Sequence, residues 1–277
     1  MQRGYDKEII IRPGGNVADY WRDIWAYREL FFFLAWRDIL VRYKQTVIGV
    51  LWCVIKPVIT MIVFTLIFGK LAQLPSGGVP YPILVFAALL PWQFFSGALT
   101  ESSNSLIANS NLLAKVYFPR LIIPVSSVMV NLVDFIISFF IMFGLMVYYH
   151  FEPGWRMVSL PLFFMFALFA SLGAGLWFAA LNVAYRDFRQ IIPFMIQFGL
   201  FISPVGFSSS IVPDKWRLLY SLNPMVAVID GFRWAVSDNG QSLYLPGIYM
   251  SSAMTFVLFA SGVWYFRRVE RSFADVI

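Results

Sequence analysis

Four long stretches of this chain contain no charged residue and no histidine; they cover 81–100, 157–185, 190–213 and 239–266. Two further apolar stretches hold a single charge each, Lys56 within 45–69 and Asp134 within 121–149. A helix that crosses a bilayer needs about 20 mostly apolar residues, and each stretch is long enough. We therefore expect an all-α, polytopic membrane protein. Its six transmembrane helices are predicted at about 45–69, 81–102, 121–149, 157–185, 190–210 and 243–266.

The overall composition supports a membrane protein and argues against a soluble one. Hydrophobic residues make up 60% of the chain and charged residues 13%, against about 45–50% and about 25% in soluble domains. With the N-terminus inside, sixteen of the 21 Lys and Arg residues fall on the inner side of the six predicted helices. Because Lys and Arg accumulate in cytoplasmic loops, we expect both termini in the cytoplasm and no nucleic-acid partner.

The segment 19–44 precedes the first predicted span and is too charged to cross a bilayer. Its large apolar side chains recur at helical spacing: Trp21, Ile24, Trp25, Phe32, Trp36, Ile39 and Tyr43. A helix with one such face lies in the plane of the membrane surface. We expect residues 1–44 to form a cytoplasmic N-terminus with an amphipathic interface helix, and 45–277 the transmembrane domain. The interface helix is either a simple anchor or a docking element for a cytoplasmic partner.

A second unusual segment follows the fifth predicted span. Its apolar run 218–229 is too short to cross a membrane and contains Asn223-Pro224. Proline lacks a backbone N–H and clashes with the preceding helical turn. Backbone that leaves the helix at membrane depth must be buried in protein or line a water-filled cavity. The segment marked by Pro213, Asn223, Pro224 and Arg233 is therefore predicted to hold short re-entrant helices; the alternative is an ordinary external loop.

Small residues four positions apart mark the fourth predicted span: Ala167, Ser171, Gly175 and Ala179. Such a ridge lets a neighbouring helix approach closely. We interpret it as a packing surface.

The chain offers little material for catalysis. It has one histidine, His150, and one cysteine, Cys53, so neither a metal cluster nor a Ser–His–Asp or Cys–His set is credible. Cys53 is interpreted as a small packing residue. The Gly69-Lys70 pair lacks the first glycine and the final Ser or Thr of the phosphate loop GxxxxGK[ST]. We expect no catalytic residue, no metal and no cofactor on this chain.

Asp134 is the only acid well inside a predicted span. A charge at the bilayer centre costs about 2.5–3.5 kcal/mol on insertion scales, so such a residue often has a function. An ion-coupled secondary transporter would use it as a proton carrier. Asn131 and Ser138 lie within one helical turn, however, and we expect them to satisfy the carboxylate.

Aromatic residues make up 19% of the chain. Most are expected in helix packing and in belts that face lipid. The C–H face of a sugar ring also slides over aromatic rings, and six aromatics near the ends of spans two and four are candidates for such a path: Trp92, Phe94, Phe95, Trp177, Tyr185 and Phe188.

Four stretches resemble one known family. They are RELFFFLAWRDILVRYKQTVIGVLWCVIKP, YPILVFAALLPWQFF, NSNLLAKVYFPRLIIPVSSVMVNLVDF, and the later group NVAYRDFRQ, ISPVGF and LNPMVAVIDGFRWAV. In this order the chain resembles the membrane subunits of ABC-2 type exporters, over nearly its whole length. It is most similar to the branch that moves lipid-linked O-antigen, capsule or teichoic-acid polymers. Ala88 stands where that family often has glycine.

The resemblance implies a permease without enzymatic activity of its own. Two such subunits form a channel as a homodimer, and two cytoplasmic ATPase subunits carry the ATP and Mg²⁺. The expected cargo is a lipid-linked polysaccharide, exported from the cytoplasm across the inner (plasma) membrane. A drug or small-lipid exporter is the alternative within the family, and an ion-coupled secondary transporter the alternative outside it.

The resemblance also implies a cytoplasmic coupling helix between spans two and three. We expect closure of the ATPase dimer to displace 37–44 and 109–120 together and so tilt spans one and two. The coupling candidates are Arg37, Asp38, Arg42, Tyr43, Lys44, Asn111, Lys115, Phe118, Pro119 and Arg120. Arginine pairs well with phosphate, so four arginines are candidates for the pyrophosphate of the lipid-linked donor. They are Arg12, Arg22, Arg186 and Arg189, and the alternative is that they follow only from the charge bias of inner loops.

Overall fold

The computed structural model describes residues 17–44, 49–76, 78–185, 187–237, 243–270 and 273. Within these ranges the chain forms helices and connecting turns and no strand, which confirms the all-α prediction. The elements are α1 Val17–Ala26, α2 Arg28–Lys44, α3 Gly49–Phe64, the π-helix η1 Thr65–Leu71, α4 Tyr81–Ala108, α5 Ser110–Lys115, α6 Ile122–Tyr148, η2 Trp155–Ser159, α7 Leu160–Ala184, α8 Phe188–Ile202, η3 Ser209–Ile211, α9 Asp214–Tyr220, α10 Pro224–Val236 and α11 Leu245–Val269.

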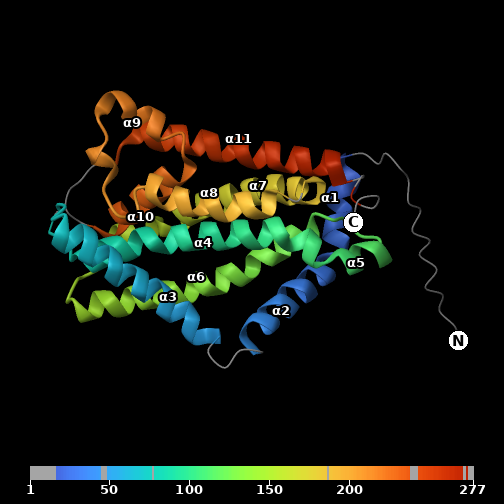
Figure 1. The fold of residues 1–277 in the computed structure, drawn as a ribbon, viewed down its shortest axis with the longest axis horizontal. Coiled ribbons are helices and arrows are strands. Elements are labelled where there is room, and N and C mark those ends of the chain that lie inside the picture. Colours follow the sequence, from blue (N-terminus) through green and yellow to red (C-terminus); the bar gives the residue numbers. More distant parts are fainter. Residues whose placement is uncertain are drawn as a thin grey trace, which may run out of the picture.

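The long helices lie side by side as one bundle (Figure 1). At one end lie α1, α5 and the last turns of α11; we call it the α5 end. At the other end lie α9 and α10; we call it the α9 end.

Five described helices are long and apolar enough to cross a membrane: Leu51–Leu71, Tyr81–Ala108, Ile122–Tyr148, Trp155–Ala184 and Leu245–Val269. This supports a multi-pass membrane protein. The fifth predicted span, 190–210, falls on α8, which has 15 residues. At about 1.5 Å per residue it is shorter than a hydrocarbon core of about 30 Å. The helix expected to reach residue 210 ends at Ile202, where the chain turns through 203–208.

The centre of the bundle is α4. In an apolar stretch of 18 residues of α4, 67% of the residues are buried; in the corresponding stretch of Leu51–Leu71, at the periphery of the bundle, 17% are buried. The predicted ridge of small residues on α7 packs against α4: a Cβ added to Gly175 would lie 2.6 Å from the Oγ of Ser102. Such an approach needs small residues, so the interpretation of this ridge as a packing surface is confirmed.

The segment 19–44 forms two helices, separated by a turn at Tyr27. The predicted apolar face divides between two environments. Trp21, Trp25, Phe32 and Trp36 are exposed, whereas α2 packs along α6 through its other side. An orientation in the membrane surface stays a prediction for this segment.

The apolar run 218–229 is broken as its proline predicts. The Oδ1 of Asn223 accepts a hydrogen bond from the backbone N–H of Met225 at 3.0 Å and caps α10, and Pro224 is the first residue of that helix. Proline is favoured there because its missing N–H has no partner inside the helix. The segment therefore contains the short helices α9 and α10, and their re-entry into a membrane stays a prediction.

One arginine of α10 holds the turn that follows α8. Arg233 donates to the carbonyl oxygens of Leu84 at 3.4 Å, Val205 at 2.8 Å and Phe207. The hydroxyl of Tyr81 donates to the carbonyl of Gly206 at 2.9 Å. These bonds supply partners for the carbonyls of Val205, Gly206 and Phe207, which lie outside any helix, as non-helical backbone requires at membrane depth.

Candidate functional site

Two of the segments predicted to act together are joined directly at the α5 end. The Nη2 of Arg37, on α2, donates to the Oδ1 of Asn109 at 2.7 Å. It also donates to the Oδ1 of Asp38 at 2.7 Å, which fixes the guanidinium in place. Asn109 is the residue between α4 and α5. The start of α5 is therefore tied to α2 by a charge-assisted hydrogen bond, which is among the stronger kinds.

The C-terminal end of α2 is tied in turn to the membrane-spanning helices. The Nη2 of Arg42 lies 2.8 Å from the Oδ2 of Asp134 on α6, and the hydroxyl of Tyr43 donates to the Oδ1 of the same carboxylate. The Sγ of Cys53, on α3, lies 3.0 Å from that oxygen. We call these four residues the Asp134 cluster. It joins α2, α3 and α6.

The Asp134 cluster corrects two expectations. Asn131 and Ser138 were expected to satisfy Asp134, but its partners come from α2 and α3 instead. Residues one turn away share a face of the helix only approximately, and this carboxylate faces α2. Cys53 was interpreted as a packing residue, and it is a donor to Asp134.

A second acid lies close to the cluster. The Nη1 of Arg42 is 3.7 Å from the Oε1 of Glu101 on α4, so one cation serves two carboxylates. The side chains of Arg42 and Asp134 are 38% and 22% exposed. Burial raises the pKa of Tyr43 above its usual range, and donation to Asp134 raises it further. The hydroxyl therefore stays protonated and remains a donor near neutral pH.

A separate core closes the α5 end. Leu34 of α2, Phe118 of the loop after α5, and Phe266 and Phe273 at the end of the chain are buried together. Next to this core, Arg120 donates a hydrogen bond to the backbone carbonyl of Glu270, and its guanidinium carbon lies 5.9 Å from the centre of the Phe273 ring. The loop after α5 is therefore anchored to the last turns of α11.

The first helix joins the same core. The hydroxyl of Tyr20 donates to the Oε2 of Glu270 at 2.9 Å, and Arg267 stacks on the Tyr20 ring at 4.4 Å. The contacts at the α5 end thus connect α1, α2, α5 and α11.

The helix α5 and the residues that follow it carry several exposed side chains. Asn111, Lys115, Val116 and Tyr117 are exposed, while Pro119 is half-buried beside the buried Phe118. In Figure 1 α5 projects from the end of the bundle. A short exposed helix can transmit a force applied from outside when the loop that follows it is anchored to the bundle, as this loop is at Phe118 and Arg120. Lys44 is also exposed, at the end of α2.

The aromatic candidates on α4 lie inside the bundle or at its edge. Phe94 is buried between Phe135 and Phe164, at ring distances of 5.8 and 4.8 Å. Trp92 is also buried and lies 5.6 Å from the half-buried Phe95.

The other three aromatic candidates lie around α7. Trp177 stacks on Tyr265 of α11 at 4.1 Å and donates to the Oγ of Ser261 at 3.1 Å. Tyr185 is exposed and lies 6.3 Å from Phe188 at the start of α8. The six candidates thus lie in separate places within one chain, and a role in a substrate path stays a prediction.

Of the four arginines predicted to bind pyrophosphate, two are described. Arg22 is exposed on α1 and Arg189 is exposed in the first turn of α8. Arg12 and Arg186 lie outside the described residues. The pyrophosphate site stays a prediction.

Sequence reasoning missed several members of the site. Asn109 lay within the predicted loop but was not singled out, and Glu101 and Cys53 were given no electrostatic role. Asp134 carried the one available signal, a lone acid in a long apolar stretch, and that signal does not identify its partner.

The comparisons with known proteins agree with this architecture. A sequence profile described as ABC-2 type transporter matches residues 29–236. The chain belongs to the ABC-2 type transporter family. The matched region includes nearly all of α2, all of α5 and the Asp134 cluster. The helix α2 and the start of α5, which Arg37 and Asn109 connect, therefore both belong to the family domain.

Three similar proteins cover this ABC-2 family chain almost from end to end. The O-antigen export system permease protein RfbA of Myxococcus xanthus is 29% identical over 261 residues, which is 92% of this chain and 98% of that protein. A protein of the same name from Klebsiella pneumoniae is 25% identical over 253 residues, 90% and 95%. The polysialic acid transport protein KpsM of Escherichia coli is 23% identical over 240 residues, 84% and 91%.

Proposed function

We propose that this chain is the membrane subunit of an ATP-driven exporter of lipid-linked polysaccharide. It exports the polymer from the cytoplasm across the inner membrane, with both termini in the cytoplasm and ATP and Mg²⁺ held by two separate ATPase subunits. The observation that carries the proposal is the match over 92% of this chain and 98% of an O-antigen export permease.

The contacts at the α5 end suggest how force reaches the membrane. A push on α5 is passed to α2 through Arg37 and Asn109, which are 2.7 Å apart. The far end of α2 holds α3 and α6 through Asp134. Movement of α2 therefore displaces both membrane-spanning helices, because charge-assisted bonds link it to the bundle at its middle, through Arg37, and near its C-terminal end, through Arg42. This supports the coupling role of 37–44 and 109–120.

A second copy of the chain is needed to enclose a path. Since α4 fills the centre of the bundle, the path runs beside the bundle rather than through it. Large apolar side chains are exposed on α3, at Leu51 and Trp52, and on α8, at Phe194, Phe198 and Phe201. We propose that these faces meet those of a second copy and that α8 is the fifth of six spans. Contiguous exposed apolar faces mark surfaces that contact another protein or lipid.

Deletion of the gene in its native host tests the proposal. The expected result is that lipid-linked polymer accumulates inside the cell while the surface polymer is lost, and that the tagged chain co-purifies with an ATPase. The purified pair in liposomes should export the polymer only with ATP. Export by this chain alone with an ion gradient would contradict the proposal, as would normal surface polymer in the deletion strain.

A further inference from the structure

A cavity of about 530 Å³ opens at the α9 end of the bundle. Its wall is formed by residues 74–76 before α4, the first turn of α4, residues 206–211 after α8, Arg217 of α9, α10, and residues 243–244 before α11. The volume falls within the range of small-molecule sites, about 300–1,000 Å³. Neither the coupling contacts nor the Asp134 cluster includes any of these residues.

The wall of this cavity is rich in hydroxyl groups. They belong to Ser208, Ser209, Ser210, Ser237, Tyr81 and Tyr244, besides Ser76 at the rim. The Oγ atoms of Ser208 and Ser210 are 2.8 Å apart, so their turn presents two adjacent hydroxyls. A hydroxyl both donates and accepts, which suits a ligand that is itself made of hydroxyl groups.

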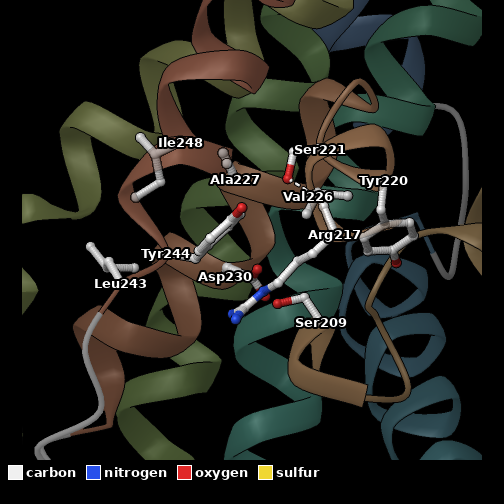
Figure 2. Close-up of a pocket in the computed structure, with 11 residues that line it drawn as sticks. Ser209, Arg217, Tyr220, Ser221, Val226, Ala227, Asp230, Leu243, Tyr244 and Ile248 are labelled. Carbon is white, nitrogen blue, oxygen red and sulfur yellow. Dashed lines mark hydrogen bonds between the residues drawn. The ribbon is translucent and has the colours of Figure 1, made fainter. Parts of the chain in front are cut away.

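Three charged side chains also line the cavity. Asp230 shares this wall with two arginines, Arg217 and Arg233, and with the hydroxyl of Ser209. Figure 2 shows the side chain of Arg217 extending from α9 toward Asp230 and Ser209, with the ring of Tyr244 alongside. The guanidinium carbon of Arg217 lies 4.3 Å from the centre of that ring.

One strong donor at this place is left over. The Nε–H of Arg217 is buried and has no acceptor among the described residues. Arg233 differs, because it donates to the carbonyls of Leu84, Val205 and Phe207. The wall of the cavity thus combines the side chain of Arg217, the carboxyl group of Asp230 and several hydroxyls. The rings of Trp234 and Tyr244 form part of the same wall.

We propose that this cavity binds sugar residues at the α9 end. Aromatic rings contact the C–H faces of a sugar, while a carboxylate, an arginine N–H and hydroxyls bond its O–H groups, each of which donates and accepts. An anionic ligand such as a phosphate fits less well, since the wall contains Asp230 and the donors of Arg233 are directed to carbonyls. The proposal rests on the proposed function in one respect, namely that the physiological ligand is the exported polymer.

The test uses the complex of this chain with its ATPase in lipid nanodiscs. The probe is the surface polysaccharide of the native host, released from its lipid by mild acid and cut to short oligosaccharides. Saturation-transfer NMR detects binding, and a titration gives the Kd. Sodium pyrophosphate is titrated in parallel as the anionic probe.

Three variants locate the binding. Ser210→Trp fills the mouth of the cavity at an exposed position, and Asp230→Asn removes the carboxylate charge with little change in shape. Leu219→Trp is the matched control, because Leu219 is exposed on α9 but does not line the cavity. We expect binding of the oligosaccharides to weaken about tenfold or more in the first two variants and to be unchanged in the control.

The outcomes separate the cavity from the transport function. Native binding in both Ser210→Trp and Asp230→Asn would overturn the sugar site, and so would pyrophosphate that displaces the oligosaccharides from the native complex. A complex that exports polymer with ATP but binds no oligosaccharide would overturn the sugar site alone. Binding that is lost in Ser210→Trp, in a complex without ATP-driven export, would overturn the proposed function and leave the sugar site standing.

Discussion

The Nη2 of Arg42 lies 2.8 Å from the Oδ2 of Asp134, and this contact joins the end of α2 to the middle of α6. Because the two side chains are 38% and 22% exposed, the pair is partly screened by solvent. Asp134 also accepts from Tyr43 and Cys53, so its removal affects three helices at once.

We expect Asp134→Ala to lower the free energy of unfolding by about 2–3 kcal/mol, somewhat less than the cost of breaking a fully buried pair. Thermal unfolding of the purified complex measures it. Glu101→Gln is the control, because Glu101 is half exposed and lies 3.7 Å from Arg42; exposed pairs contribute about 0–1 kcal/mol. The double variant Arg42→Asp with Asp134→Arg should lose less stability than the sum of the losses in Arg42→Asp alone and in Asp134→Arg alone. Losses that simply add would show that the two side chains do not interact.

Charge reversal at the end of α2 should uncouple the transporter. In Asp38→Arg the guanidinium of Arg37 loses its carboxylate partner, and in Arg42→Glu the link to α6 becomes repulsive. We expect ATP hydrolysis by the assembled complex to continue while export falls about tenfold or more, within the usual range of coupling energies. Lys215→Glu, on the exposed surface of α9, is the control. Undiminished export in both α2 variants would discard the coupling role.

The long helices could be predicted because apolar length alone determines them. The predicted spans 81–102, 121–149, 157–185 and 243–266 correspond to α4, α6, α7 and α11. A backbone inside a membrane must satisfy its own polar groups, so an apolar stretch of that length has no alternative to a helix. The helix α8 ends at Ile202, where a turn follows, so the prediction from apolar length alone extended this helix too far.

The partner of Asp134 could not be predicted, because it depends on how α2 and α6 are rotated and placed against each other. Sequence neighbours such as Asn131 are the only candidates that spacing offers. The actual donors, Arg42 and Tyr43, lie on another helix. The same holds for Arg37 and Asn109, which were both within predicted segments but not predicted to touch.

Arg233→Met should loosen the turn after α8. The substitution keeps much of the apolar stem but removes the donors to three carbonyls. Hydrogen bonds from a charged group contribute about 1.5–3 kcal/mol, and unpaired buried carbonyls add to the loss. We expect a lower Tm and faster proteolysis within 203–208. Lys215→Met, which changes an exposed lysine on the adjacent helix, should leave both unchanged; equal effects of the two variants would contradict the role of Arg233.

The contact between Tyr20 and Glu270 should make stability depend on alkaline pH. Burial, and then the charge of Glu270, raises the pKa of Tyr20 above its usual value. The unfolded tyrosine titrates near pH 10, about its model value. The neutral hydroxyl therefore contributes its full stabilisation below that pH, and the contribution falls as the pH rises further.

Tyr20→Phe tests this dependence. The variant should be less stable than the native chain at about pH 8, and the difference should narrow toward about pH 11. Tm values across this range measure the difference. Tyr249→Phe removes an exposed hydroxyl and should run parallel to the native curve. A constant difference between Tyr20→Phe and the native chain would show that this hydroxyl is not held neutral by the fold.

The crossing of α7 and α11 depends on a backbone contact at Gly262. A Cβ added there would lie 2.4 Å from the carbonyl oxygen of Gly173, and backbone cannot yield as a flexible side chain does. Gly262→Ala should therefore separate the two helices and lower stability by about 1–3 kcal/mol. Gly144→Ala on α6 is the matched control, since a Cβ there meets nothing within 4 Å. That control should gain up to about 1 kcal/mol from the higher helix propensity of alanine. Equal Tm changes in the two variants would show that the close approach of α7 and α11 contributes nothing to stability.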